Sequence, residues 1–206
     1  MSLGKFITVE GIEGVGKSTN IDFICERLKL FGIETLVTRE PGGTPLGESL
    51  RNLLLHGDSV NDKAELLMMF ASRAQHIETK IKPALAQGIW VICDRFTDST
   101  YAYQGGGRQL NGEWIEGLEL LVHEAFQPDL TVLLDAPVEV GRARAAKRGA
   151  ADRIEAEDLV FFNRVRETFL QRARSFSRFA VVDAAMPLDD VQSQLGEIVD
   201  RLVNRV

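Results

Sequence analysis

One stretch of the chain, residues 11–18, has the residue types and the spacing of a phosphate-binding loop. It reads Gly-Ile-Glu-Gly-Val-Gly-Lys-Ser, which fits the pattern G-x-x-x-x-G-K-[ST]. Glycines let the backbone turn tightly, so that successive N–H groups point at phosphate oxygens. Lys17 would then reach the terminal phosphates, and Ser18 is placed to coordinate Mg²⁺. The motif predicts a nucleoside triphosphate site; the alternative is a plain glycine-rich turn.

Two further groups of polar residues follow short apolar runs. Asp94 ends the run at residues 89–93, where its carboxylate is expected to hold Mg²⁺ through water, or else to cap the next turn. Arg95 comes directly afterwards, and its planar guanidinium suits a phosphate. Glu40 and Pro41 follow the run at residues 35–38, where proline and the next glycines favour a rigid turn.

Five motifs, in this order, resemble those of bacterial thymidylate kinases over nearly the whole chain. They are Gly11 to Thr19, Thr38-Arg39-Glu40-Pro41-Gly42-Gly43-Thr44, Asp94-Arg95-Phe96, Tyr103-Gln104-Gly105-Gly106-Gly107-Arg108 and Asp152-Arg153-Ile154-Glu155. The resemblance implies the reaction ATP + dTMP → ADP + dTDP, with Mg²⁺, in a homodimer. It implies that ATP contacts Gly11, Glu13, Gly14, Val15, Gly16, Lys17, Ser18 and Thr19.

The same resemblance assigns residues to the acceptor nucleotide. Arg95 holds its phosphate, and Arg73 and Gln104 read the base, because a guanidinium donates to a carbonyl and an amide both donates and accepts. The full set is Glu40, Pro41, Arg51, Met69, Phe70, Arg73, Arg95, Thr100, Tyr103 and Gln104. Arg51 is either a second phosphate clamp or a solvated side chain.

The sequence departs from the family four residues before Arg73. A phenylalanine that stacks on thymine is common there, whereas this chain has Met69, with Phe70 next to it. Either Met69 contacts the base through its sulfur, or Phe70 takes over the stacking. Both side chains are also compatible with a place in the core.

An arginine-rich segment at residues 142–153 is predicted to be a mobile lid over the triphosphate. Arginines that close on a transferring phosphoryl group stabilise its charge. The phosphate-binding loop has no arginine of its own, and some thymidylate kinases carry one where Gly14 stands. Arg148 and Arg153 are therefore the expected catalytic residues beside Lys17 and Arg95, and Arg144 is expected to stack on adenine. The alternative is a solvated helix end with cations near its negative pole.

The elements that must position these residues alternate along the chain. Continuously apolar, β-branched runs lie at 6–9, 35–38, 89–93, 130–134 and 179–182, as in strands covered on both faces. Helical periodicity covers 17–31, 62–86, 112–126, 137–148, 154–174 and 188–203. This order predicts one α/β domain, residues 1–206, with a doubly wound five-stranded parallel sheet and ligands beyond the carboxyl ends of the strands.

Composition narrows the choice of function. The 206 residues are 45% hydrophobic and 26% charged, with 24 Lys and Arg against 30 Asp and Glu, a net charge of −6. Such values are typical of a globular protein and disfavour nucleic-acid or anionic-membrane partners. Without an apolar run of membrane-spanning length or a signal peptide, a cytoplasmic location is expected. The rival functions are a deoxynucleoside or other nucleotide kinase, and a non-catalytic nucleotide-sensing switch.

Overall fold

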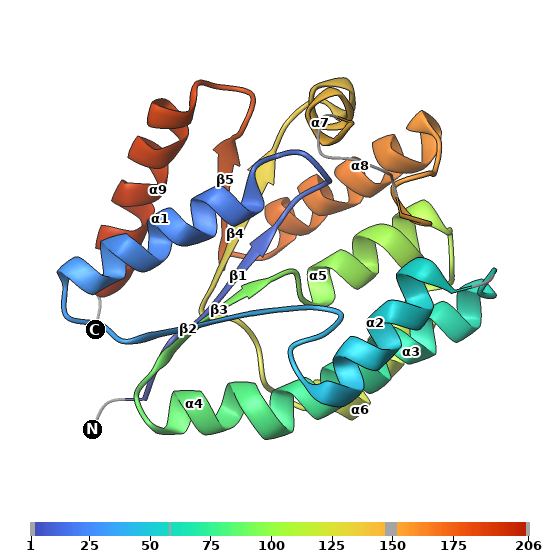
Figure 1. Ribbon diagram of the computed structural model, residues 1–206, viewed down its shortest axis with the longest axis horizontal. Coiled ribbons are helices and arrows are strands. Elements are labelled where there is room, and N and C mark those ends of the chain that lie inside the picture. Colours follow the sequence, from blue (N-terminus) through green and yellow to red (C-terminus); the bar gives the residue numbers. More distant parts are fainter. Residues whose placement is uncertain (1–2, 58, 147–151, 205–206) are drawn as a thin grey trace.

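A computed structural model describes residues 3–57, 59–146 and 152–204, and its centre is a five-stranded parallel sheet. The strands lie in the order β2-β3-β1-β4-β5. They are β1 (Phe6–Glu10), β2 (Thr35–Arg39), β3 (Trp90–Asp94), β4 (Leu130–Asp135) and β5 (Phe179–Asp183). Figure 1 shows the sheet with helices on both faces. The predicted doubly wound α/β fold with five parallel strands is confirmed.

The three central strands are buried on both faces, which explains their continuous apolar sequence. Every residue of β1 is buried, and Ile7 pairs with Ile92 on one side and Leu130 on the other. The two edge strands are more open, since Val37 and Val181 are each about half exposed. Parallel pairing brings the acidic ends of the strands to one edge of the sheet, where ligands bind in folds of this class.

The helices form two layers around this sheet. They are α1 (Lys17–Leu30), α2 (Pro45–His56), α3 (Asp62–His76), α4 (Lys82–Ala86), α5 (Thr97–Thr100), α6 (Gly112–His123), α7 (Val138–Ala145), α8 (Leu159–Ser175) and α9 (Leu188–Val203). In Figure 1, α1 and α9 lie side by side on one face, and the rod formed by α3 and α4 lies on the other face together with α6 and α8.

The predicted helix at 62–86 contains a local change of winding. A π-helical segment, η1 (Ile77–Ile81), joins α3 to α4, so that the rod is continuous but not uniformly α-helical. A second π-helical segment, η2 (Tyr101–Gly107), follows α5 directly. Segments of this kind are often found at functional sites.

The helical segment at residues 97–107 was not among the predicted helices. Its sequence is polar and glycine-rich and has no apolar repeat for helix prediction to detect. A distant group fixes its start: the buried Glu10 carboxylate accepts hydrogen bonds from the Phe96 N–H at 2.7 Å and the Ser99 hydroxyl at 2.6 Å. This tertiary contact takes the place of a local cap.

Candidate active site

The phosphate-binding loop lies between β1 and α1, as the motif requires. Gly11, Gly14 and Gly16 have φ values of 137°, 77° and 88°, which side-chain-bearing residues rarely adopt. The Lys17 ammonium lies inside the loop and donates to the carbonyl oxygens of Gly11 and Ile12, both at 3.2 Å. The loop thus holds its lysine by weak contacts that incoming phosphate oxygens can replace.

Burial changes the charge behaviour of Lys17. Removal from water, together with the nearby Arg95 guanidinium, lowers the pKa of Lys17 to about 8, against the upward pull of Asp94 and Glu13. An anion bound at this position would stabilise the protonated form. In the free loop, the Lys17 ammonium therefore loses its proton only slightly above neutral pH. A bound phosphate would favour the protonated form of Lys17.

Oxygen ligands suitable for Mg²⁺ lie next to this loop. Ser18 at the start of α1 and Asp94 at the end of β3 line one cavity. The Oδ1 atom of Asp94 is buried, and no hydrogen-bond partner is found for it in the described part of the chain. No group of three or more His, Cys, Asp or Glu side chains among the described residues suits a metal. This donor set fits Mg²⁺, which takes one or two protein ligands and its other ligands from phosphate and water.

A cavity of about 200 Å³ adjoins the loop and collects most of the predicted acceptor residues. The sequence-predicted residues that line it are Glu13, Lys17, Glu40, Pro41, Arg51, Met69, Arg73, Asp94, Arg95, Thr100, Tyr103 and Gln104. Its wall also includes Leu55, Phe96, Ser99, Asp152, Ile154 and Glu155. We call this the acceptor cavity, after the prediction that it binds the acceptor nucleotide. By the same prediction, its phosphate end contains Lys17 and Arg95, and its base end contains Met69, Arg73 and Gln104.

At the base end, a buried ionic network holds Arg73. Its Nε atom donates to Glu40 Oε2 at 2.7 Å, and both side chains are nearly inaccessible. The Nη1 atom is buried and has no partner in the described residues, and no hydrogen bond of Nη2 is found there either. The rings of Phe70 and Phe96 lie 4.8 and 5.3 Å from the guanidinium carbon. Among the described residues only Nε is paired, so that Arg73 is held in place while both of its Nη groups keep unused N–H donors.

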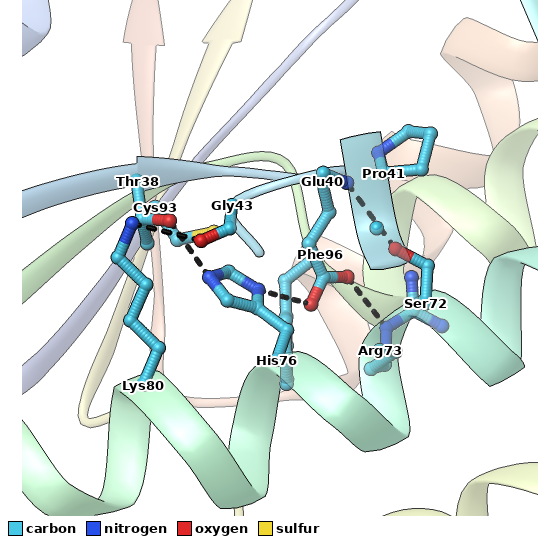
Figure 2. A network of polar contacts seen from close by, with 12 residues as sticks. Thr38, Glu40, Pro41, Gly43, Ser72, Arg73, His76, Lys80, Cys93 and Phe96 are labelled. Atoms are coloured by element: carbon cyan, nitrogen blue, oxygen red, sulfur yellow. Dashed lines mark hydrogen bonds and ion pairs between the residues drawn. The ribbon is translucent and has the colours of Figure 1, made fainter. Parts of the chain in front are cut away.

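His76 completes this network one turn further along α3 (Figure 2). Its Nδ1 lies 3.0 Å from Glu40 Oε1, and its Nε2 lies 2.7 Å from the Thr38 hydroxyl. Burial by itself would raise the pKa of Glu40, but Arg73 and His76 together hold it below its usual value. Glu40 is thus a fixed carboxylate that anchors Arg73.

The turn after Glu40 is held against the same helix. Figure 2 shows Ser72 next to Pro41 and Lys80 next to Gly43. The Gly42 N–H donates to the Ser72 hydroxyl at 3.2 Å, and Lys80 donates to the Gly43 carbonyl at 2.9 Å. Contacts to α3 and η1 therefore position the whole turn, which the sequence predicted to be rigid.

At the phosphate end, Arg95 occupies a constrained backbone position with φ 68°. Its guanidinium donates to Glu13 at 2.7 Å and to the Ser99 hydroxyl at 3.1 Å, and it lies 4.8 Å from the Tyr103 ring centre. The Tyr103 hydroxyl also donates to Glu13, at 2.8 Å. Arg51 donates to the Pro41 carbonyl at 2.9 Å. Both arginines line the cavity but are held by protein oxygens.

The two candidate stacking residues are placed differently. Met69 lines the acceptor cavity, whereas Phe70 packs with Leu66 and Ile115 in a separate apolar cluster. The α-helix turns 100° per residue, so that adjacent residues cannot share one face. Phe70 is therefore placed behind Arg73, and Met69 faces the position expected for the base.

The predicted lid residues are only partly within the described structure. Arg144 at the end of α7 donates to the Ala184 carbonyl at 2.7 Å, and Arg148 lies outside the described residues. Arg153 donates to Glu65 at 2.5 Å and to the Leu54 carbonyl at 2.9 Å, and it is not among the residues lining the acceptor cavity. The structure therefore pairs Arg153 with α2 and α3 and does not place it among the residues that line the cavity with Lys17.

The structure also explains why the phosphate-binding loop has no arginine. A Cβ atom added at Gly14 would lie 1.9 Å from the Gly141 carbonyl oxygen in α7. Gly14 also has a positive φ, so that any side chain there would be strained. An arginine at this position would require α7 to move.

Sequence reasoning missed Glu65 and His76, although both belong to the site. Glu65 is buried and accepts a hydrogen bond from the Gln104 amide nitrogen at 2.8 Å. Its spacing is a usable signal, because Glu65, Met69 and Arg73 recur every four residues and share one helix face. The relation of His76 to Glu40 has no such signal in the sequence.

Comparison with known proteins agrees with this geometry. The family model for thymidylate kinase matches residues 9–195. The thymidylate kinase of Alcanivorax borkumensis is 54% identical over 202 residues, 97% of each chain, and that of Chromohalobacter salexigens is 53% identical over 99% of each chain. The chain belongs to the thymidylate kinase family. This confirms the predicted family and a phosphotransferase function.

A solved structure supports the same conclusion. The crystal structure of thymidylate kinase from Ehrlichia chaffeensis superposes with a TM-score of 0.79 at 34% identity, covering 96% of this chain and 98% of that one. Among the described residues, no helix has the length and apolar character needed to cross a membrane.

Proposed function

We propose that this chain transfers the γ-phosphoryl group of ATP to dTMP, giving ADP and dTDP, and that the acceptor cavity binds dTMP. One observation carries the proposal: a single cavity joins Lys17 and Arg95 to the buried, partly unsatisfied Arg73. A nucleoside monophosphate has this arrangement, with a phosphate at one end and a base with hydrogen-bonding groups at the other.

At the base end, an unpaired Nη group of Arg73 is proposed to donate to a pyrimidine carbonyl, and Gln104 is proposed to contact the neighbouring ring position. Met69 supplies an apolar contact to the ring face. Thr100 and Tyr103 are proposed to line the sugar. A missing methyl group in such a pocket costs about 1–3 kcal/mol, so that dUMP should be a weaker acceptor than dTMP.

At the phosphate end, Arg95 and Arg51 are proposed to hold the acceptor phosphate. An oxygen of that phosphate attacks the γ-phosphorus as the bond to the ADP oxygen breaks, and no covalent enzyme intermediate is needed. Lys17 and the loop N–H groups hold the phosphates of ATP. Ser18 and Asp94 would hold Mg²⁺, which supplies neutralisation of the developing phosphate charge.

The arginines at residues 142–153 remain proposed participants. Arg148 and Arg153 are proposed to stabilise the transferring group, and Arg144 to stack on adenine. Since Arg153 contacts Glu65 in this structure, it would have to exchange that carboxylate for phosphate oxygens during turnover.

We also propose that the enzyme is a cytoplasmic homodimer. Support comes from the family resemblance and from exposed leucines on the outer helices. These are Leu53 on α2, Leu67 on α3, and Leu120 and Leu121 on α6. Light scattering after size exclusion should give twice the mass of the chain, and a monomer at all protein concentrations would contradict this assembly.

A panel of acceptors tests the proposed reaction. ADP release coupled to ATP turnover should be fastest with dTMP, weaker with dUMP, and far weaker with dCMP and AMP. An equal or higher kcat/KM with AMP, dCMP or thymidine would contradict the assignment. ATP binding without acceptor-dependent ADP release would instead favour a nucleotide-sensing switch.

A further inference from the structure

Glu65 is a buried carboxylate on α3 to which the proposed reaction assigns no part. Only 1% of its side chain is exposed. Its position, one turn before Met69 and two turns before Arg73, places it on the helix face that borders the base end of the acceptor cavity. A buried acidic group is costly unless it is paired, so that its partners indicate its role.

Those partners include two guanidinium groups and one amide. Arg153 donates to Glu65 Oε2 at 2.5 Å, and Arg108 approaches Oε1 at 3.5 Å. The Gln104 amide nitrogen donates to Oε1 at 2.8 Å. A carboxylate paired with two guanidiniums can accept hydrogen bonds but has no proton to donate. The amide of Gln104 can therefore meet Glu65 only through its NH₂ group.

This constraint decides how Gln104 faces the cavity. With its nitrogen held by Glu65, the remaining polar atom of the amide is the oxygen Oε1, for which no partner is found in the described part of the chain. Arg73 lines the same cavity, and its two Nη groups are unpaired donors in the described residues. The base end thus presents a fixed donor from Arg73 and a fixed acceptor from Gln104.

We propose that Glu65 is the positioning residue that sets base selectivity, by locking the Gln104 amide with its oxygen toward the acceptor cavity. The inference rests on the proposed binding of the base at this end. A donor beside an acceptor matches a pyrimidine with a carbonyl next to a ring N–H, as in thymine and uracil. Cytosine presents an amino group next to an unprotonated ring nitrogen, which mismatches both positions. Guanine shares the pattern of thymine and must be excluded by its size.

The size of the effect follows from the cost of unpaired buried groups. A site built around specific hydrogen bonds rejects an analogue that lacks them by up to about 10⁴–10⁵-fold. If the Gln104 amide were free to rotate, its NH₂ group could face the ring nitrogen of cytosine, and part of this discrimination would be lost.

The test is the dTMP:dCMP preference of Glu65→Gln, measured as kcat/KM by ADP release and as Kd by calorimetry without ATP. A glutamine at 65 can offer its own NH₂ group to the Gln104 oxygen and so permit the turned amide. We expect the preference to fall by at least about tenfold. Glu157→Gln is the matched control, because Glu157 also pairs with Arg108 but does not contact Gln104; it should keep the parent preference.

A double variant separates positioning from general structure. If Glu65 acts through Gln104, adding Glu65→Gln to Gln104→Leu should change the preference by less than about twofold. If the effects of the two substitutions on the dTMP:dCMP preference multiply in the double variant, the inference is overturned. A folded Glu65→Gln variant with the parent preference would overturn it as well. If Glu65→Gln does not fold, Glu65→Asp replaces it: the shorter carboxylate keeps the charge but withdraws from the Gln104 amide, so the preference must fall, and a parent preference would overturn the inference. A parent protein inactive with dTMP would instead defeat the proposed function.

Discussion

The two ends of the acceptor cavity differ in what holds their charged groups. At the base end, carboxylates in the protein interior hold the two residues proposed to contact the base: Glu40 pairs with Arg73, and Glu65 pairs with Gln104. At the phosphate end, Lys17 contacts loop carbonyls that phosphate oxygens can replace. The base end is therefore assembled before substrate arrives, whereas the phosphate end must exchange partners. Selection and transfer are thus expected to depend on different residues.

The largest effect is expected at the phosphate end, from Lys17→Ala. The variant removes a buried charge that is proposed to contact the ATP phosphates, so that kcat should fall by about 10³-fold or more. Because Lys17 has no contact with the base readers, the Kd for dTMP should change little. Single-turnover kinetics would measure the loss of rate, and calorimetry would measure the Kd for dTMP. A loss of dTMP affinity as large as the loss of rate would contradict the proposed difference between the two ends.

The variant Arg153→Ala tests whether Arg153 acts at the phosphate end or at the base end of the acceptor cavity. If it stabilises the transferring group, kcat should fall by up to about 10³-fold with the KM for dTMP nearly unchanged, and Arg153→Lys should rescue poorly. This is the result we expect. Steady-state kinetics would contradict it if only the KM for dTMP rose, because Arg153 would then act at the base end through Glu65.

Activity should also fall at high pH through Lys17. Its pKa of about 8 means that the ammonium loses its proton as the pH rises past that value, and the uncharged amine attracts phosphate less. The kcat/KM for ATP, which reports the free enzyme, should drop about tenfold per pH unit above 8. In Lys17→Arg, the residual activity should stay flat up to pH 9.5. The same drop in that variant would exclude Lys17 as its cause.

The smallest effects on activity are expected from substitutions of Met69 and Phe70. Met69→Ala should raise the KM for dTMP by about threefold to tenfold, because it removes an apolar contact in the cavity. Phe70→Leu should leave KM near the parent value while lowering the melting temperature, since Phe70 packs in the core. The reverse ranking, measured by kinetics and thermal denaturation, would show that Phe70 contacts the base.

Local sequence predicted the phosphate-binding loop and the Asp94-Arg95 pair, but not the contacts that hold Arg73 and Gln104 in place. The phosphate-binding loop and the Asp94-Arg95 pair are contiguous in sequence and follow predictable strands. The contacts of Glu65 with Gln104 and of His76 with Glu40 join residues 39 and 36 positions apart. They depend on helix packing, which no local pattern specifies. The ambiguity between Met69 and Phe70 had the same origin, because a shift of 100° around α3 decides which residue faces the cavity.

Binding of dTMP without ATP tests the account most directly. Calorimetry on Lys17→Ala and Arg73→Lys compares one variant from each end. Arg73→Lys keeps the charge opposite Glu40 but removes the two unpaired Nη groups. We predict that Lys17→Ala binds dTMP within about threefold of the parent and that Arg73→Lys binds at least about tenfold more weakly. Normal binding by Arg73→Lys, with loss of binding in Lys17→Ala, would contradict a preassembled base end.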